Sequence, residues 1–260
     1  MPVDSPERES FKILNPLGED TSIMRTTTLP SMLEILTRNY NFRNKEVRLY
    51  ELGRTYHLGG KDGLAIEKKY LTLGTYGAKV NFFTVKGLVE AIMKDLRVEN
   101  VRFEACTDNP SYHPGRCASV WAGDECIGVF GQIHPLVAAN YGVDTELYCA
   151  ELSLEKLLNA CGPDPIYTPL PKFPAVTRDI AVVCDKSIPV AKLIDCISKA
   201  GGKYLKGCSL FDIYTGSHKK SVAFSLTLRA DDQTLTDDHA EETMKAVLDA
   251  LERDFGASMR

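Results

Sequence analysis

A dense run of prolines is the feature that most limits how this chain can fold. Five prolines lie between Pro163 and Pro174, directly after Cys161 and Gly162. Proline fixes the backbone φ angle and has no N–H to donate, so neither a helix nor a central strand can continue through such a run. A proline-rich passage is instead a stiff connector. We therefore predict four segments in order: a flexible N-terminal segment (1–10), a first domain (11–162), a linker (163–171) and a second domain (172–260).

The bulk composition excludes several classes of protein. The 260 residues suffice for two domains that each bury a core. No apolar run reaches the ~18 residues that indicate a membrane span. The first residues, MPVDSPERES, lack the apolar stretch of a signal peptide, and we expect a cytoplasmic protein. The eight cysteines never form a C-x-x-C pair, which is typical of buried, reduced thiols rather than of a zinc site.

Helical and strand patterns are mixed in the first domain. Apolar residues recur at helical spacing from Leu29 to Tyr40, and again from Val85 to Met93. Runs rich in β-branched and aromatic residues predict strands between them and after them. This mixture favours an α+β fold with a mainly antiparallel sheet. The predicted strands are 47–58, 70–76, 118–121, 126–130 and 147–151. One predicted helix begins near residue 29, and the other covers 84–96.

The second domain has the predicted element order β-α-β-β-α-β. Thr236 is placed to cap the second helix, whose first turn holds Asp237 and Asp238, and Gly256 is placed to end it. This is the order of a ferredoxin-like domain; both helices then cover one face of the sheet and leave the other open. The predicted elements are strand 178–185, helix 189–200, strands 210–214 and 221–228, the helix after Thr236, and strand 257–260.

Two of these strands alternate apolar and polar residues, which is the pattern of half-buried strands. We expect the apolar members to share the covered face: Phe211, Ile213, Val222, Phe224, Leu226 and Leu228. The open face then carries Asp212, Tyr214, Ser221, Ala223, Ser225 and Thr227. An acid, an aromatic ring and a hydroxyl on one open face suit a flat polar ligand such as a nucleobase.

The charge of the second domain is divided between its two parts. Residues 172–230 hold ten Lys or Arg against four Asp or Glu, a net charge of +6, and residues 231–260 hold three against nine, a net charge of −6. The two alternating strands lie in the basic part. A basic local field suits a partner that carries phosphates, although complementary charges on a neighbouring helix and sheet would give the same count.

Several motifs resemble those of one known family. FPAVTRDI (173–180), LFDIY (210–214) and KSVAF (220–224) resemble the ferredoxin-fold anticodon-binding domain that closes the β subunit of phenylalanine-tRNA synthetase. Five upstream motifs resemble the same subunit's catalytic-like module, so the resemblance covers residues 11–260 in the family's order. These motifs are LNPL (14–17), SIMRT (22–26), YELGR (50–54), HPGR (113–116) and GVFGQIHP (128–135).

The resemblance implies a class II synthetase-like antiparallel sheet in the first domain. It also implies a heterotetramer of two α and two β subunits that attaches phenylalanine to tRNA(Phe) with ATP and Mg²⁺. No cofactor or metal is implied for this chain, because the family's magnesium-binding carboxylates precede this region.

Class II chemistry needs two arginines that hold the ATP phosphates. RLYE (48–51) has an extra residue between arginine and glutamate, and no arginine follows Gly128 and Gly131 on their strand. We therefore expect a catalytically silent first domain, with Arg25, Arg48 and Glu51 in packing or interface ion pairs.

By resemblance, Asp212, Tyr214 and Ser221 occupy positions that contact the tRNA anticodon. A tyrosine ring can stack on an unpaired base, while a carboxylate can accept from the N1 and N2 hydrogens of guanine and a hydroxyl can bond a base edge. Lys219 and Lys220 would attract phosphates, and Arg178 would either orient its strand through an ion pair or reach the RNA backbone. The predicted anticodon-binding set is Asp212, Tyr214, Ser221, Lys220 and Arg178.

Together these patterns predict the C-terminal part of a phenylalanine-tRNA synthetase β subunit. Its expected role is to recognise tRNA(Phe) and support the aminoacylation that the α subunit performs. Two alternatives are a free-standing RNA- or protein-interaction module without a role in aminoacylation, and a ligase with its chemistry in the first domain.

Overall fold

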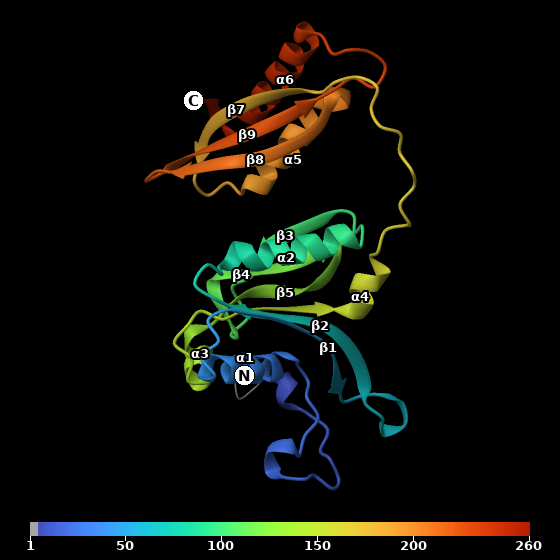
Figure 1. The fold of residues 1–260 in the computed structure, drawn as a ribbon, viewed down its shortest axis with the longest axis vertical. Helices are drawn as coiled ribbons and strands as arrows, with labels where there is room; N and C mark the ends of the chain where they lie inside the picture. The colour runs from blue at the N-terminus through green and yellow to red at the C-terminus, as the bar shows by residue number, and fades with distance from the viewer. Residues whose placement is uncertain (1–4) are drawn as a thin grey trace. The chain divides into compact units, whose positions relative to one another are not determined.

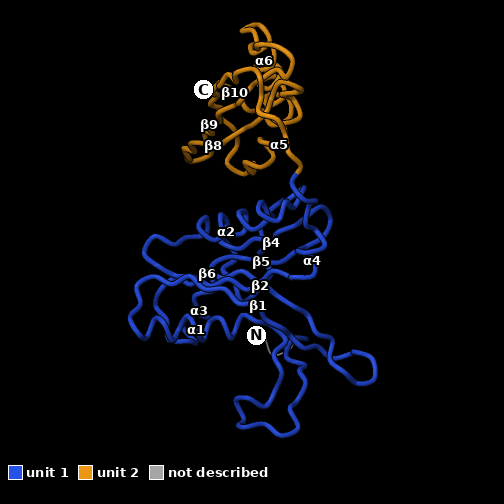
Figure 2. The backbone as a smooth tube through the Cα atoms, turned by 45° about the vertical axis from the view of Figure 1, so that its right-hand side comes forward, with its two compact units in different colours: residues 1–165 blue, residues 166–260 orange. Residues whose placement is uncertain are grey.

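The computed structural model describes residues 5–260, which divide into two compact units at Pro165 (Figure 2). The division lies between Pro165 and Ile166, within the segment 163–171 that the prolines mark as a connector. The predicted flexible segment 1–10 falls partly on residues 1–4, which lie outside the described residues. The rest of it contains the short helix η1 (Pro6–Arg8), and Thr26 Oγ1 donates to the Glu7 carbonyl at 2.5 Å. Within the described part of the chain, no helix has both the length and the apolar character to cross a membrane.

The first unit is built on a six-stranded sheet in which every neighbouring pair is antiparallel. The strand order across the sheet is β1-β2-β6-β5-β4-β3, so β1 and β3 form its two edges. The strands are β1 (Val47–His57), β2 (Ile66–Tyr76), β3 (Val101–Ala105), β4 (Tyr112–Ala122), β5 (Glu125–Ile133) and β6 (Tyr148–Ser153).

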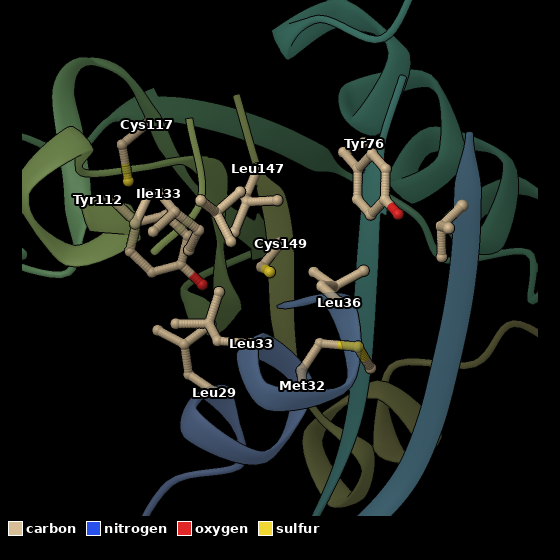
Figure 3. Packing of buried hydrophobic residues seen from close by; sticks show 13 residues of the cluster. Leu29, Met32, Leu33, Leu36, Tyr76, Tyr112, Cys117, Ile133, Leu147 and Cys149 are labelled. Carbon is tan, nitrogen blue, oxygen red and sulfur yellow. The ribbon is translucent and has the colours of Figure 1, made fainter. Parts of the chain in front are cut away.

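Helices cover both faces of this sheet (Figure 1). Helices α1 (Leu29–Asn41) and α3 (Pro135–Asn140) pack on one face, and α2 (Phe82–Asp95) and α4 (Leu154–Asn159) pack on the other. Figure 3 shows the core under α1, where Leu33 and Leu36 meet residues from several strands. Gly74 lets α1 approach β2 closely, because a Cβ at that position would lie 2.4 Å from Met32 Sδ.

The sequence patterns locate most of these elements. The predicted helices and strands of the first domain are confirmed, with ends that differ by a few residues, whereas β3, α3 and α4 were not predicted. Three short helices, η2 (Glu19–Thr21), η3 (Lys61–Gly63) and η4 (Gly202–Tyr204), lie in connections. All eight cysteines are free thiols, and burial raises the pKa of the Cys149 thiol.

The second unit has the predicted β-α-β-β-α-β order, and its sheet order is β10-β7-β9-β8, all antiparallel. Both helices pack on the same face, over one apolar cluster. The α+β prediction with a ferredoxin-like second domain is confirmed. The elements are β7 (Val176–Asp185), α5 (Val190–Ala200), β8 (Leu205–Thr215), β9 (Lys219–Leu228), α6 (Asp237–Phe255) and β10 (Ser258–Met259).

Helix α6 begins and ends where the sequence predicts. The Thr236 hydroxyl accepts from the His239 N–H at 3.5 Å, and Asp237 and Asp238 lie in the first turn. Gly256 adopts a left-handed conformation with φ of 58°, and its N–H donates to the Glu252 carbonyl. Glycine reaches this conformation without the steric cost of a Cβ, so the helix stops there and the chain returns to the sheet as β10.

Candidate nucleic-acid interface

One face of the second unit's sheet carries no helix in the described chain, because α5 and α6 both pack on the other face. The register assigns side chains to the two faces. On β9, the side chains that are completely buried under the helices belong to Val222, Phe224, Leu226 and Leu228. The open face therefore holds Ser221, Ala223, Ser225 and Thr227 of β9, with Thr177, Asp179, Ala181 and Val183 of β7 and Asp212 and Tyr214 of β8.

Asp212, Tyr214 and Ser221 lie close together on this face. Tyr214 pairs directly with Ser221, and Asp212 pairs with Ala223. Directly opposite residues have Cβ atoms about 4.5–5.5 Å apart, and residues two positions apart in one strand, such as Asp212 and Tyr214, lie roughly 7 Å apart. Tyr214 is 69% exposed, and within residues 5–260 the side chains of these three residues make no hydrogen bond or ion pair. All three are therefore free to contact a ligand.

Mostly small side chains lie beside these three residues on the open face. Ala223 and Ala181 follow Asp212 across the sheet, and Ser221 and Val183 follow Tyr214. Small side chains leave room above the sheet, so a planar group could lie against Tyr214 while its edge meets Asp212.

A β-bulge at Phe211 places Asp212 and Tyr214 on this face. The register shifts between Leu210, which pairs with Phe224, and Asp212, which pairs with Ala223. An extra residue in one strand interrupts the strict alternation of side chains and can re-aim those beyond it. If Phe211 instead occupied a regular position in the ladder, alternation from Ser209 on the open face would send Asp212 to the helix side.

The bulge also corrects the predicted apolar set. Val222, Phe224, Leu226 and Leu228 are buried as predicted, but Phe211 is 59% exposed because, as the bulged residue, it has no partner on β9. Ile213 faces the helix side with Val222, yet it is 43% exposed. Its strand is the sheet edge, and the hairpin end of β8 and β9 projects beyond α5 (Figure 1).

Lys220 lies on the opposite face from the three central residues, which corrects its predicted place beside them. It follows the same alternation as Val222 and is only 9% exposed. Its Nζ donates to the carbonyl of Ile188, which lies just before helix α5. The Lys220 side chain is therefore nearly buried on the helix side and does not point to the open face.

Arg178 is also on the helix side, where the register sets it opposite Leu226. Its Nη2 lies 2.9 Å from Asp237 Oδ1, in the first turn of α6. Of the two predicted roles for Arg178, this ion pair corresponds to the first, which is to orient the strand. Of the five predicted residues, the structure brings Asp212, Tyr214 and Ser221 together on the open face and places Lys220 and Arg178 on the helix side.

Lys219 is a cation that does lie on the open face. It follows the alternation of Ser221 and pairs with Asp185 across the sheet. The signal for this distinction was present in the sequence: counting alternate residues back from Val222 and from Ile180 places Lys220 and Arg178 with the buried set and Lys219 with the open set.

In the first unit, two of the three residues expected in ion pairs form one. Arg25 Nη2 lies 2.6 Å from Glu51 Oε1, and Arg25 Nε donates to the Arg54 carbonyl at 2.8 Å. Arg48 is exposed and makes no ion pair in residues 5–260. Arg25 therefore joins the loop before α1 to strand β1.

Comparisons with known proteins agree with this architecture. Residues 1–154 match the family described as the phenylalanyl tRNA synthetase beta chain CLM domain, and residues 171–260 match the ferredoxin-fold anticodon binding domain. The phenylalanine–tRNA ligase beta subunit of Clostridium acetobutylicum is 40% identical over all of this chain and 33% of its own length. That of Bacillus licheniformis is 36% identical over 97% of this chain and 33% of its own.

The chain thus spans about a third of the length of these curated relatives. A solved pyrrolysyl-tRNA synthetase from Desulfitobacterium hafniense aligns with 61% of this chain and 55% of its own, at 14% identity and a TM-score of 0.48; that alignment establishes neither a shared fold nor a shared function. The two matched families occur in succession and together cover most of the sequence. The chain belongs to the phenylalanyl-tRNA synthetase beta chain family and carries its CLM domain followed by a ferredoxin-fold anticodon-binding domain.

Proposed function

We propose that the second unit recognises the anticodon of tRNA(Phe) through Asp212, Tyr214 and Ser221. The observation that carries this proposal is that three unpaired, chemically complementary side chains meet on the uncovered sheet face. Tyr214 stacks on one unpaired base, Asp212 accepts two hydrogens from a guanine edge, and Ser221 bonds a base edge beside the ring. Lys219, on the same face, contributes attraction to a phosphate.

In this proposal the chain supports a reaction that takes place elsewhere. It acts as part of a phenylalanine–tRNA ligase β subunit, and the first unit serves assembly with the α subunit rather than chemistry. ATP and Mg²⁺ belong to the whole ligase, which works in the cytoplasm. Anticodon binding orients the tRNA so that its acceptor end reaches the active site of the α subunit.

The test is to measure the affinity of the full 260-residue chain for a tRNA(Phe) transcript, using fluorescence anisotropy. Tyr214→Ala should weaken binding by about 5- to 150-fold, because stacking on an aromatic side chain contributes roughly 1–3 kcal/mol per base. Asp212→Asn should weaken binding to the cognate transcript and reduce discrimination against a transcript whose anticodon guanine is replaced by adenine.

Matched control variants separate recognition from general effects. Tyr167→Ala removes another exposed tyrosine, from the connector, and Asp249→Asn neutralises an exposed acid of α6 on the far side of the sheet. Both controls should bind as the unchanged chain does. If the Tyr214 and Asp212 variants bound every transcript as tightly as the unchanged chain does, the anticodon assignment would be disproved. Binding that salt does not weaken would favour the alternative of a protein-docking module.

A further inference from the structure

Two cysteines of the first unit face each other across neighbouring segments of the sheet. The ladder between β3 and β4 ends with Ala105 opposite Ala118, so the next pair along it is Cys106 and Cys117. The Cys106 N–H donates to the Cys117 carbonyl at 3.1 Å, which continues the pairing past the end of β3. In residues 5–260, no strand ladder sets any other cysteine opposite a second one.

Both thiols lie on the same side of the sheet. Cys117 is buried in the core beneath α1 (Figure 3), and Cys106 packs against that same core. Burial raises the pKa of the Cys117 thiol, and the neighbouring Cys106 side chain raises this pKa further. Register, core packing and this interaction therefore agree that the two side chains are neighbours.

The spacing of the pair is close to that of a disulfide. Hydrogen-bonded partners in antiparallel strands have Cα atoms about 5.5 Å apart, within the roughly 4.4–6.8 Å of disulfides. Their Cβ atoms are about 4.5–5.5 Å apart, whereas a disulfide needs about 3.5–4.5 Å, so bond formation requires an approach of up to about 1 Å. Cys106 lies one residue beyond β3 and before β4 begins at Tyr112, so it can move without disturbing either strand.

A small molecule can reach one thiol of the pair but not the other. Cys106 is half-buried and lines a cavity of about 630 Å³, and Cys117 is not part of its lining. This volume lies within the roughly 300–1,000 Å³ of small-molecule pockets. The Cys106 thiol donates to Asp108 Oδ1, at 3.2 Å, beside the same cavity. A reagent in the cavity would therefore meet Cys106 first.

The charge of the cavity selects among such reagents. Besides His57, its lining holds three carboxylates and one lysine. Nearby carboxylates repel an anion and attract a cation, so a neutral or cationic reagent should enter more readily than an anionic one. The charged residues of the lining are Glu7, Asp108, Glu151 and Lys68.

We propose that Cys106 and Cys117 form a reversible disulfide by exchange with a small neutral or cationic disulfide. The Cys106 thiolate attacks one sulfur of the small disulfide, so a mixed disulfide forms at Cys106 and one thiolate leaves. The Cys117 thiolate then attacks the Cys106 sulfur, so the protein disulfide forms and the second thiolate leaves. The two protein thiols are oxidised, the small disulfide is reduced to two thiols, and the two cysteine protons end on the released thiolates.

The approach that the bond requires makes it easy to reverse. A disulfide held away from its preferred geometry stores strain and is reduced more readily, as suits a transient, redox-sensing bond. The bond would close a loop from residue 106 to residue 117 and remove the thiol that donates to Asp108. Both cysteines belong to the first unit, so this proposal is independent of tRNA recognition by the second unit.

The test treats the folded full chain with cystamine, a cationic disulfide, blocks the remaining thiols and maps the products by mass spectrometry. Trypsin cuts after Arg102 and Arg116, so the expected bond joins peptide 103–116 to the peptide that begins at Cys117. The chain should lose two hydrogens at this pair and keep no cystamine fragment on Cys106, and dithiothreitol should restore both thiols. Cystamine should form the bond faster than glutathione disulfide, which is anionic.

Three variants separate the two steps. Cys117→Ala should stop at the mixed disulfide on Cys106, and Cys106→Ser should leave Cys117 unmodified. Cys149→Ala is the matched control: Cys149 and Cys117 flank Gly131 on opposite sides, about 9.6 Å apart and beyond the reach of a disulfide, so this variant should still form the bond.

The unchanged chain decides the outcome, whether or not each variant is stable. The proposal is overturned if Cys106 does not react or keeps its mixed disulfide. It is also overturned if Cys117 bonds another cysteine, or if glutathione disulfide forms the bond as fast as cystamine does.

Discussion

Two adjacent lysines, Lys219 and Lys220, are expected to respond to substitution in opposite ways. Lys220 is 9% exposed and its Nζ donates to the Ile188 carbonyl. Replacing it with alanine leaves that carbonyl without this donor and removes buried methylene groups. The cost of an unsatisfied buried polar group is about 1–3 kcal/mol, so Lys220→Ala should lower the free energy of unfolding of the second unit by about that amount.

Lys219 faces the open side of the sheet, so its substitution should change tRNA binding and leave stability almost unaltered. A lost phosphate contact reduces the slope of log affinity against log salt by about 0.7–0.9. Between about 50 and about 200 mM salt, that reduction corresponds to about a threefold smaller loss of affinity. Lys219→Ala should show this smaller salt dependence, and Lys220→Ala should keep the slope of the unchanged chain.

The assay combines tRNA binding at several salt concentrations with urea unfolding. The lone tryptophan, Trp121, lies in the first unit, so hydrogen exchange of peptides from residues 172–260 should report on the second unit. The assignment of faces is refuted if Lys220→Ala lowers the salt slope without lowering stability, or if Lys219→Ala destabilises β9. Either outcome would mean that the register of β9 differs from that described.

Further predictions concern stability. Tyr112 has a buried hydroxyl with no partner in the described chain, whereas the Tyr76 hydroxyl donates to the Asn44 carbonyl at 3.0 Å (both tyrosines are in Figure 3). Tyr112→Phe should therefore raise, and Tyr76→Phe lower, the free energy of unfolding by about 1 kcal/mol each in urea titrations; the opposite order would contradict these contacts. Burial and the hydrogen bond to a neighbouring carboxylate raise the pKa of Tyr148 to about 12. Because this pKa exceeds the value of ~10 in the unfolded chain, the stabilisation is complete below about pH 10 and is lost as the pH rises toward about 12; Tyr148→Phe should flatten this part of the stability profile. Gly256→Ala should lower the melting temperature, since a non-glycine residue in the left-handed conformation costs roughly 1–2 kcal/mol. A Cβ at this position would meet no atom within 4 Å, so the cost would come from the backbone conformation alone. An unchanged melting temperature would show that α6 ends differently.

Local patterns in the sequence predict most of the fold because its helices and strands follow simple periods. The long-range contacts that complete them are not visible in this way. Leu29 and Pro30 indicate where α1 begins, but the N–H groups of Thr28 and Leu29 are satisfied by Glu151 Oε1, at 3.2 and 3.1 Å, from strand β6 more than 120 residues later. No local signal connects these positions, since the contact exists only after the sheet has formed.

The placement of the candidate site residues on the sheet could be predicted only in part, for a similar reason. Alternation within β8 and β9 correctly joins Asp212, Tyr214 and Ser221. Lys220 was placed beside them because it is near in sequence, and Arg178 was given two alternative roles, an ion pair that orients its strand or a contact with the RNA backbone. Their alternation places them on the helix side. The exposure of Phe211 could not be predicted, because a bulge is defined only by the pairing of β8 with β9.

The bulge gives a strict test of how the site is built, through two single-residue deletions in the same strand. Leu210 and Asp212 pair with the consecutive residues Phe224 and Ala223, so deleting Phe211 yields a regular ladder and keeps Asp212 and Tyr214 on the open face. Deleting Ile213 instead makes Asp212 and Tyr214 adjacent, and adjacent residues of a regular strand point to opposite faces. The first deletion should retain tRNA affinity within about twofold, as for an exposed position, and the second should weaken it at least as much as Tyr214→Ala or Asp212→Asn alone. If both deletions reduced affinity equally, recognition would depend on the shape of the hairpin and not on the shared face of these two side chains.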